Sequence, residues 1–127
     1  MTSLMEKNMS KLALMVDGVA VSKFDLPVGE TTIGRAIDNT IHIDDLAVSS
    51  HHAKIVVSPD PYLEDSYRFE LIDLGSTNTT RLNGHKIQTT SLLKDGDQIM
   101  IAYNLFKFIT DNSDFERTAV ILPDNLD

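Results

Sequence analysis

Apolar and polar residues alternate in short runs along most of the chain, which is the pattern of β-strands that bury one face and expose the other. No window of about 12 residues repeats its apolar positions with the helical period, so we expect many strands and few helices. Residues 11–16 and 19–24 form two such runs on either side of Asp17-Gly18. This dipeptide predicts a hairpin, because a type I′ turn needs positive φ at both central positions.

Further strands are expected up to residue 109, separated by turn residues such as Asn83-Gly84 and Asp95-Gly96. The expected strands span residues 31–34, 41–43, 53–57, 67–73, 80–82, 98–101 and 105–109. Turn signals about every 8 to 12 residues indicate two packed antiparallel sheets. The pattern therefore predicts an all-β sandwich.

The composition changes after residue 109. Residues 111–127 contain Asp and Glu at five positions and a single basic residue, around the short apolar stretch Ala119-Val120-Ile121-Leu122. We therefore expect a β-sandwich over residues 10–110, an acidic C-terminal tail over 111–127 and an N-terminal lead-in over 1–9.

A chain of 127 residues with 42% hydrophobic residues is long enough for one domain that buries its own core. The formal net charge of −8 repels polyanions, which argues against binding to nucleic acid or to an anionic membrane surface. The sequence contains no cysteine, so disulfides, thiol nucleophiles and thiolate metal sites are excluded. With no signal-peptide pattern and no stretch of about 18 apolar residues, we expect a cytoplasmic protein.

Three polar segments interrupt the strand pattern: Gly34-Arg35, Ser49-Ser50-His51-His52 and Gly75-Ser76-Thr77-Asn78. A phosphate ester with two negative charges is bound well by a guanidinium group together with hydroxyl and amide donors at fixed positions. One arginine with serine, threonine and asparagine supplies this set. The segments therefore predict a phosphate-recognition site formed by loops.

The order and spacing of these segments, followed by Leu82-Asn83-Gly84, resemble the forkhead-associated (FHA) domain from about residue 12 to residue 109. The resemblance implies a β-sandwich of about eleven strands, of the FHA/SMAD-like type, whose loops at one end bind phosphothreonine peptides. It also implies a non-catalytic adaptor in Ser/Thr kinase signalling, with a phosphothreonine-containing protein as partner.

The resemblance implies a role for each polar residue of the predicted site. Arg35 would hold the phosphate by charge-assisted hydrogen bonds, and Ser49 would donate its hydroxyl to another phosphate oxygen. Ser50 matches a second polar phosphate ligand. Thr77 and Asn78 match the loop that contacts both the phosphothreonine and the peptide main chain, a task that suits an amide because it can donate and accept.

Supporting roles follow from the same resemblance. The His52 imidazole would brace the binding loops from inside, Asn39 would brace the segment after Arg35, and Asn83-Gly84 would form an ordering turn with Gly84 at positive φ. The full supporting set is Gly34, Asn39, His52, Gly75, Asn83 and Gly84.

One position departs from the family pattern. Thr79 stands where the usual Gly-Ser-Thr-Asn-Gly-Thr run has its second glycine. If this position needs positive φ, a β-branched threonine is strained there by about 1 to 2 kcal/mol. The loop path and the geometry of Asn78 are then expected to differ slightly from the family pattern.

Other chemistries fit the sequence less well. The four histidines are not spaced as metal ligands, Gly75 to Asn78 lacks the lysine of a P-loop, and Ser49 lacks a nucleophile-elbow sequence. We therefore expect no metal, no cofactor and no enzymatic activity. A second interpretation of the sandwich is a structural or assembly module that binds its partners without phosphate.

Thr118 is a candidate phosphoacceptor in the acidic tail, three residues before Ile121. One hypothesis is that a Ser/Thr kinase phosphorylates Thr118 and that the domain then binds its own tail or that of a neighbour. The alternative is that Val120-Ile121-Leu122 adds an edge strand or packs on a sheet.

Overall fold

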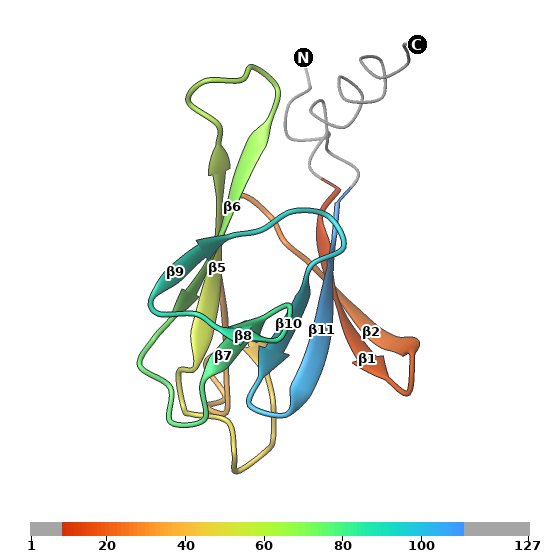
Figure 1. The fold of residues 1–127 in the computed structure, drawn as a ribbon, viewed down its shortest axis with the longest axis vertical. Helices are drawn as coiled ribbons and strands as arrows, with labels where there is room; N and C mark the ends of the chain where they lie inside the picture. The colour runs from red at the N-terminus through yellow and green to blue at the C-terminus, as the bar shows by residue number, and fades with distance from the viewer. Residues whose placement is uncertain (1–8, 111–127) are drawn as a thin grey trace.

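The computed structural model describes residues 9–110, which form eleven strands in two packed sheets (Figure 1). The predicted all-β sandwich is confirmed. The strands are β1 (Lys11–Val16), β2 (Val19–Asp25), β3 (Gly29–Gly34), β4 (Ile41–His42), β5 (Ala53–Pro59), β6 (Tyr67–Asp73), β7 (Thr80–Leu82), β8 (His85–Lys86), β9 (Thr90–Leu92), β10 (Gln98–Ile101) and β11 (Asn104–Ile109).

The six-stranded sheet has the order β2-β1-β11-β10-β7-β8, and the five-stranded sheet has the order β4-β3-β5-β6-β9. Neighbouring strands are antiparallel except for β3 and β4, which run parallel over two residue pairs. β4 is the edge strand of the five-stranded sheet, and the end of β3 lies between β4 and the start of β5, where Ile33 pairs with both Ile41 and Ala53. This arrangement positions Arg35, the first residue after β3.

The predicted first hairpin is confirmed by its turn. Asp17 and Gly18 have φ of 52° and 79°, and Val16 pairs with Val19 across them. Two of the eleven strands, β8 and β9, were not expected as strands from the residue pattern. They are two and three residues long and mostly polar, so they show no alternation.

The inner faces of the two sheets form one core. Leu12 and Phe108 of the six-stranded sheet and Ile55 and Leu71 of the five-stranded sheet are completely buried. The rings of Phe69 and Phe108, one from each sheet, lie 4.9 Å apart at an interplanar angle of 58°. This packing fixes the strand ends from which the loops emerge.

The loops that carry the three polar segments lie together at one end of the sandwich. They connect β3 to β4, β4 to β5 and β6 to β7, at the lower end in Figure 1, whereas β1 begins and β11 ends at the upper end. Residues 1–8 and 111–127, including Thr118, lie outside the described residues, so the expected domain boundaries stay predictions. No helix occurs within residues 9–110, and hence no helical membrane span.

Candidate functional site

Arg35 is held in place before any ligand binds. Its Nε donates a hydrogen bond to the carbonyl oxygen of Val48 at 2.9 Å, and its backbone N–H donates to the carbonyl of Ser49 at 3.0 Å. Among the described residues, the two terminal guanidinium nitrogens have no hydrogen-bond partner. They are therefore available for two parallel hydrogen bonds to the oxygens of an anion.

Gly34 allows the two loops at this site to approach closely. A Cβ at this position would lie 2.3 Å from the carbonyl oxygen of Ser50, which is backbone and has little room to move. The same approach lets the backbone N–H of Ala36 donate to that oxygen at 3.1 Å. Glycine is needed here for space, because its φ lies outside the left-handed region.

Ser49 connects the β4–β5 loop to the β6–β7 loop. Its Oγ accepts a hydrogen bond from the backbone N–H of Thr77 at 3.0 Å, which leaves the hydroxyl proton of Ser49 free to be donated. Direct hydrogen bonds thus link Arg35 to Ser49 and Ser49 to Thr77. The structure therefore brings together three residues that lie far apart in the chain.

The other two predicted ligands lie on the same loops. The hydroxyls of Ser50 and Thr77 are exposed and make no hydrogen bond to a described residue. Asn78 donates from Nδ2 to the carbonyl of Ala47 at 2.8 Å. This bond orients the Asn78 amide and leaves its oxygen and one N–H for a peptide main chain.

His52 is completely buried behind these loops. Its Nδ1 accepts the backbone N–H of Ser49 at 3.1 Å, and its Nε2 lies 2.9 Å from the carbonyl oxygen of Thr79. A carbonyl can only accept, so Nε2 carries the proton and the ring is the neutral Nε2–H tautomer. The imidazole therefore joins the two loops that hold Ser49 and Thr77.

This bonding excludes Ser49 and His52 as the nucleophile and general base of a serine hydrolase. Both ring nitrogens of His52 are occupied by backbone groups, and the Oγ of Ser49 contacts the N–H of Thr77 instead of the imidazole. A general base would need a free nitrogen within hydrogen-bond reach of that Oγ. Within residues 9–110, no group of three or more His, Asp or Glu residues is arranged to hold a metal ion.

Asn39 braces the segment after Arg35. Its Nδ2 donates to the carbonyl oxygens of Ala36 and Ser50, both at 2.8 Å. The side chain is buried, and its Oδ1 has no hydrogen-bond partner among the described residues. Asn39 thus closes the β3–β4 loop and ties it to the β4–β5 loop.

Asn83 and Gly84 form the turn between β7 and β8, with φ of 51° and 88°. The Asn83 side chain donates to Asp97 at 3.0 Å and accepts the backbone N–H of Gln98 at 2.9 Å. These contacts fasten the turn to the start of β10. No hydrogen bond within the described part of the chain connects Asn83 or Gly84 directly to Arg35, Ser49 or Thr77.

Asp73 is a bracing residue that is not among the site residues predicted from the sequence. It ends β6 and accepts hydrogen bonds from the hydroxyls of Ser76 at 2.6 Å and Thr80 at 2.7 Å, and from the backbone N–H of Gly75 at 3.0 Å. Burial alone would raise the pKa of this carboxyl, but the hydroxyl and backbone donors together lower it. Asp73 therefore stays ionised at neutral pH and shapes the Gly75 to Asn78 segment.

Asp45 has a similar role in the β4–β5 loop. It accepts the backbone N–H of Ala47 at 2.9 Å and the side-chain amide of Asn104 at 3.0 Å, and these two bonds lower its pKa. The carbonyl of Ala47 in turn accepts a hydrogen bond from the side-chain amide of Asn78. Asp45 therefore supports the predicted ligand Asn78 through Ala47. A carboxylate two residues before the N–H it accepts is a recognisable turn signal.

Thr79 has a φ of 66°, the left-handed conformation in which a β-branched residue is strained. We expect Thr79→Gly to raise the free energy of unfolding by about 1 kcal/mol, because glycine removes the strain at some cost in chain entropy. Urea unfolding followed by circular dichroism measures this change. The matched control is Thr89→Gly, a loop threonine without positive φ, which should not be stabilising; equal effects at both positions would contradict the strain argument.

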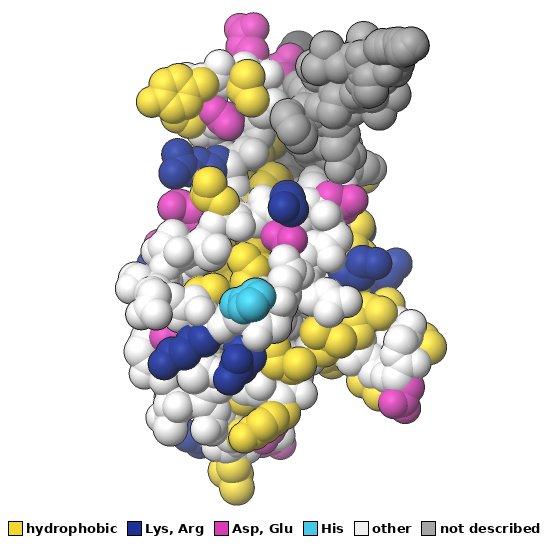
Figure 2. Space-filling model, viewed as in Figure 1, with side chains coloured by type: hydrophobic (Ala, Val, Ile, Leu, Met, Phe, Trp, Pro, Cys, Tyr) yellow, Lys and Arg dark blue, Asp and Glu magenta, His cyan; other side chains and the backbone are white. Residues whose placement is uncertain are grey.

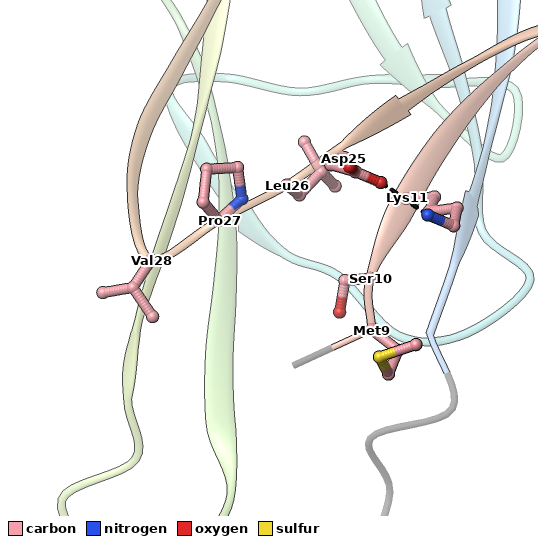
Figure 3. Close-up of a pocket in the computed structure, with 7 residues that line it drawn as sticks. All are labelled: Met9, Ser10, Lys11, Asp25, Leu26, Pro27 and Val28. Atoms are coloured by element: carbon pink, nitrogen blue, oxygen red, sulfur yellow. Dashed lines mark hydrogen bonds and ion pairs between the residues drawn. The ribbon is translucent and has the colours of Figure 1, made fainter. Parts of the chain in front are cut away.

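A separate cavity lies at the other end of the sandwich (Figure 3). It has a volume of about 460 Å³ and lies between the start of β1 and the segment that joins β2 to β3. Its described lining is largely apolar, including Met9, Leu26, Pro27 and Val28, and the one cation among these lining residues, Lys11, is paired with Asp25. This cavity has no donor set suited to phosphate, in contrast to the surface around Arg35.

Two curated relatives match most of the sandwich. The transcriptional regulatory protein EmbR of Mycobacterium tuberculosis is 32% identical over 104 residues, which are 82% of this chain and 25% of EmbR. The oxoglutarate dehydrogenase inhibitor of Corynebacterium jeikeium is 37% identical over 82 residues, which are 65% of this chain and 51% of that protein. The chain thus spans a quarter to about half of the length of these relatives.

Solved structures show the same fold. Mycobacterium tuberculosis EmbR in complex with a low-affinity phosphopeptide superimposes with a TM-score of 0.66 at 31% identity, over 79% of this chain and 24% of that one. A structure from an analysis of phosphothreonine-dependent FHA domain interactions superimposes with a TM-score of 0.65 at 29% identity, over 79% of this chain and 94% of that one. The family model for the FHA domain matches residues 31–102. On this sequence match and this fold, the chain belongs to the FHA domain family.

Proposed function

We propose that this FHA domain is a non-catalytic reader of phosphothreonine, which links a phosphorylated protein to Ser/Thr kinase signalling. The observation that carries the proposal is the prepared donor set around Arg35. Within residues 9–110, two guanidinium nitrogens and the Ser49 hydroxyl proton have no hydrogen-bond partner, while the Arg35 Nε and the Ser49 Oγ are fixed by hydrogen bonds to neighbouring loops. Little ordering free energy is then lost when a phosphate binds.

The proposed ligand contacts follow from the free atoms. The terminal nitrogens of Arg35 bind two phosphate oxygens, and the hydroxyls of Ser49 and Ser50 donate to the others. Thr77 and the amide of Asn78 bind the phosphothreonine and the peptide main chain. Phosphopeptide binding by EmbR and the phosphothreonine-dependent FHA interactions of the second structural neighbour support this ligand class.

The proposed adaptor acts in the cytoplasm. The chain contains no cysteine, so its fold does not depend on disulfides or on an oxidising compartment. The acidic surface does not prevent binding, because charges more than about 10 Å from the phosphate are largely screened at physiological salt. Nucleic acid and anionic membranes carry charge over a much longer span and are disfavoured as partners.

Calorimetry with peptides selected from an oriented phosphothreonine library tests the proposal. We expect a dissociation constant in the range of about 1 to 100 μM for the phosphorylated form, and no measurable binding after phosphatase treatment. The phosphoserine form should bind about 10-fold more weakly, through loss of one methyl contact. Equal binding of the phosphorylated and dephosphorylated peptides would instead identify a phosphate-independent assembly module.

A further inference from the structure

One face of this acidic protein gathers positive charge. In the six-stranded sheet, Leu12 and Phe108 point into the core, so the residues next to them along β1 and β11 point outward. The strand register places Lys107 beside Ala13, and Ala13 beside Lys23. Lys23 and Lys107 are exposed, and Ala13 between them is completely buried. Two cations from different strands therefore flank one small side chain.

A second row of residues crosses the same surface closer to the loops. Lys86 pairs with Arg81, Arg81 with Met100, Met100 with Leu105, and Leu105 with Met15. The three apolar side chains in this row are only partly buried. The row therefore offers apolar contact area beside two exposed cations.

We define the basic face as this outer surface of the six-stranded sheet. Figure 2 views it directly: Lys and Arg side chains (dark blue) lie over the β7–β8 hairpin and, to the right, beside β1 and β2, with hydrophobic side chains (yellow) between them. The cations of the basic face are Lys11, Lys23, Arg81, Lys86 and Lys107.

The pairing of these cations differs from that on the other sheet. On the five-stranded sheet, Lys54 is paired with Glu30 at 3.0 Å and Arg68 with Glu70 at 4.0 Å. On the basic face, Lys11 is paired with Asp25, but the other four cations form no ion pair with any described residue. Within residues 9–110, four cations on one surface are therefore without carboxylate partners, in a protein whose formal net charge is −8.

Residues 111–127 have the complementary composition. They contain Asp111, Asp114, Glu116, Asp124 and Asp127 with a single Arg117, and apolar residues at Phe115 and from Ala119 to Leu122. This segment follows Thr110 directly, and Thr110 follows β11, one of the central strands of the basic face. Seventeen residues can span up to roughly 55 Å, whereas six strands are only about 24 Å wide.

We propose that residues 111–127 pack across the basic face of the same chain, with their carboxylates on the unpaired cations and their apolar residues on Met100, Leu105 and Met15. The contact needs no phosphate and leaves the loops around Arg35 open. Exposed ion pairs are weak one at a time and are screened by salt, so the contact depends on several pairs acting with the apolar side chains.

A spin label on the tail tests this proposal, and the cysteine-free sequence makes the labelling specific. In full-length Asn125→Cys carrying a nitroxide, we expect the amide signals of Lys23, Arg81 and Lys107 to lose most of their intensity at low ionic strength. Lys54 on the other sheet should keep its signal. Molar salt should restore the lost intensity, because it screens the ion pairs.

Charge variants provide the matched comparison. Lys23→Glu with Lys107→Glu should remove the broadening, whereas Lys54→Glu with Arg68→Glu, the same change in net charge on the other sheet, should not. Neutralising the tail by Asp114→Asn, Glu116→Gln, Asp124→Asn and Asp127→Asn should also remove it without touching the sandwich. Broadening that survives Lys23→Glu with Lys107→Glu, or that survives neutralisation of the tail, would overturn the proposal.

Three other patterns of broadening would overturn the proposal. Broadening centred on Arg35 and Ser49 would place the tail at the phosphate site. Broadening that appears only between a labelled chain and a second, isotope-enriched chain would assign the basic face to the tail of a neighbouring copy. Broadening confined to the residues next to Thr110 would show that the tail does not pack on the domain.

Discussion

Arg35→Ala should weaken binding of a phosphothreonine peptide by about 100-fold or more, equivalent to about 3 kcal/mol. The substitution removes both free guanidinium nitrogens and leaves the phosphate without a cation in an acidic protein. Arg35→Lys should recover only part of the loss, because an ammonium group cannot make the fork-shaped contact and cannot keep the Nε bond to Val48. Calorimetry with the wild-type ligand measures both effects.

Two controls separate binding from folding in this experiment. Arg68→Ala removes a cation that is paired with Glu70 on the five-stranded sheet, and it should leave phosphopeptide affinity unchanged. Thermal unfolding of Arg35→Ala shows whether the sandwich stays folded without the bond to Val48. Unchanged affinity in a folded Arg35→Ala protein would favour the phosphate-independent assembly module over the reader.

His52→Ala should lower the free energy of unfolding by about 3 kcal/mol. It opens a cavity at a completely buried position and leaves the N–H of Ser49 and the carbonyl of Thr79 without their partner. Because both groups belong to the binding loops, the same variant should also weaken phosphopeptide binding. Urea unfolding and calorimetry measure the two effects separately.

The matched control is His85→Ala, at an exposed position in β8, which should change stability by less than about 0.5 kcal/mol. A His52→Ala protein as stable as His85→Ala would mean that the two loops hold their positions without the imidazole. In that case the hydrogen bonds from Thr77 to Ser49 and from Asn78 to Ala47 would suffice to join them.

Local signals in the sequence were enough for much of the sandwich. The Asp17-Gly18 turn and the alternation in residues 53–57 and 67–73 identify their elements, because one face of each strand is buried and the turn needs positive φ. The strands β8 and β9 are short and polar, and they exist because β7 and β6 offer hydrogen-bond partners beside them. Such strands depend on tertiary context and leave no pattern of their own.

The candidate site was also only partly predictable from the sequence. The residue types around Arg35 and Ser49 indicate a phosphate, but only the fold shows that these residues and Thr77 are directly hydrogen-bonded. The space requirement at Gly34 depends on Ser50, which lies on another loop. Asp73 was not predicted, because an aspartate at the end of a strand is a common turn residue. Its bracing role depends on the hydroxyls of Ser76 and Thr80, which only the structure places beside it.

The chain enters and leaves the sandwich at one end, and the candidate site lies at the other end. β1 begins and β11 ends at the end away from the loops that carry Arg35 and Ser49 (Figure 1). A reporter joined to the sandwich itself at residue 9 or residue 110 would therefore start at the end away from these loops. Immobilising the sandwich through either of these two positions should present the loops that carry Arg35 and Ser49 to solvent, which suits capture of phosphorylated proteins.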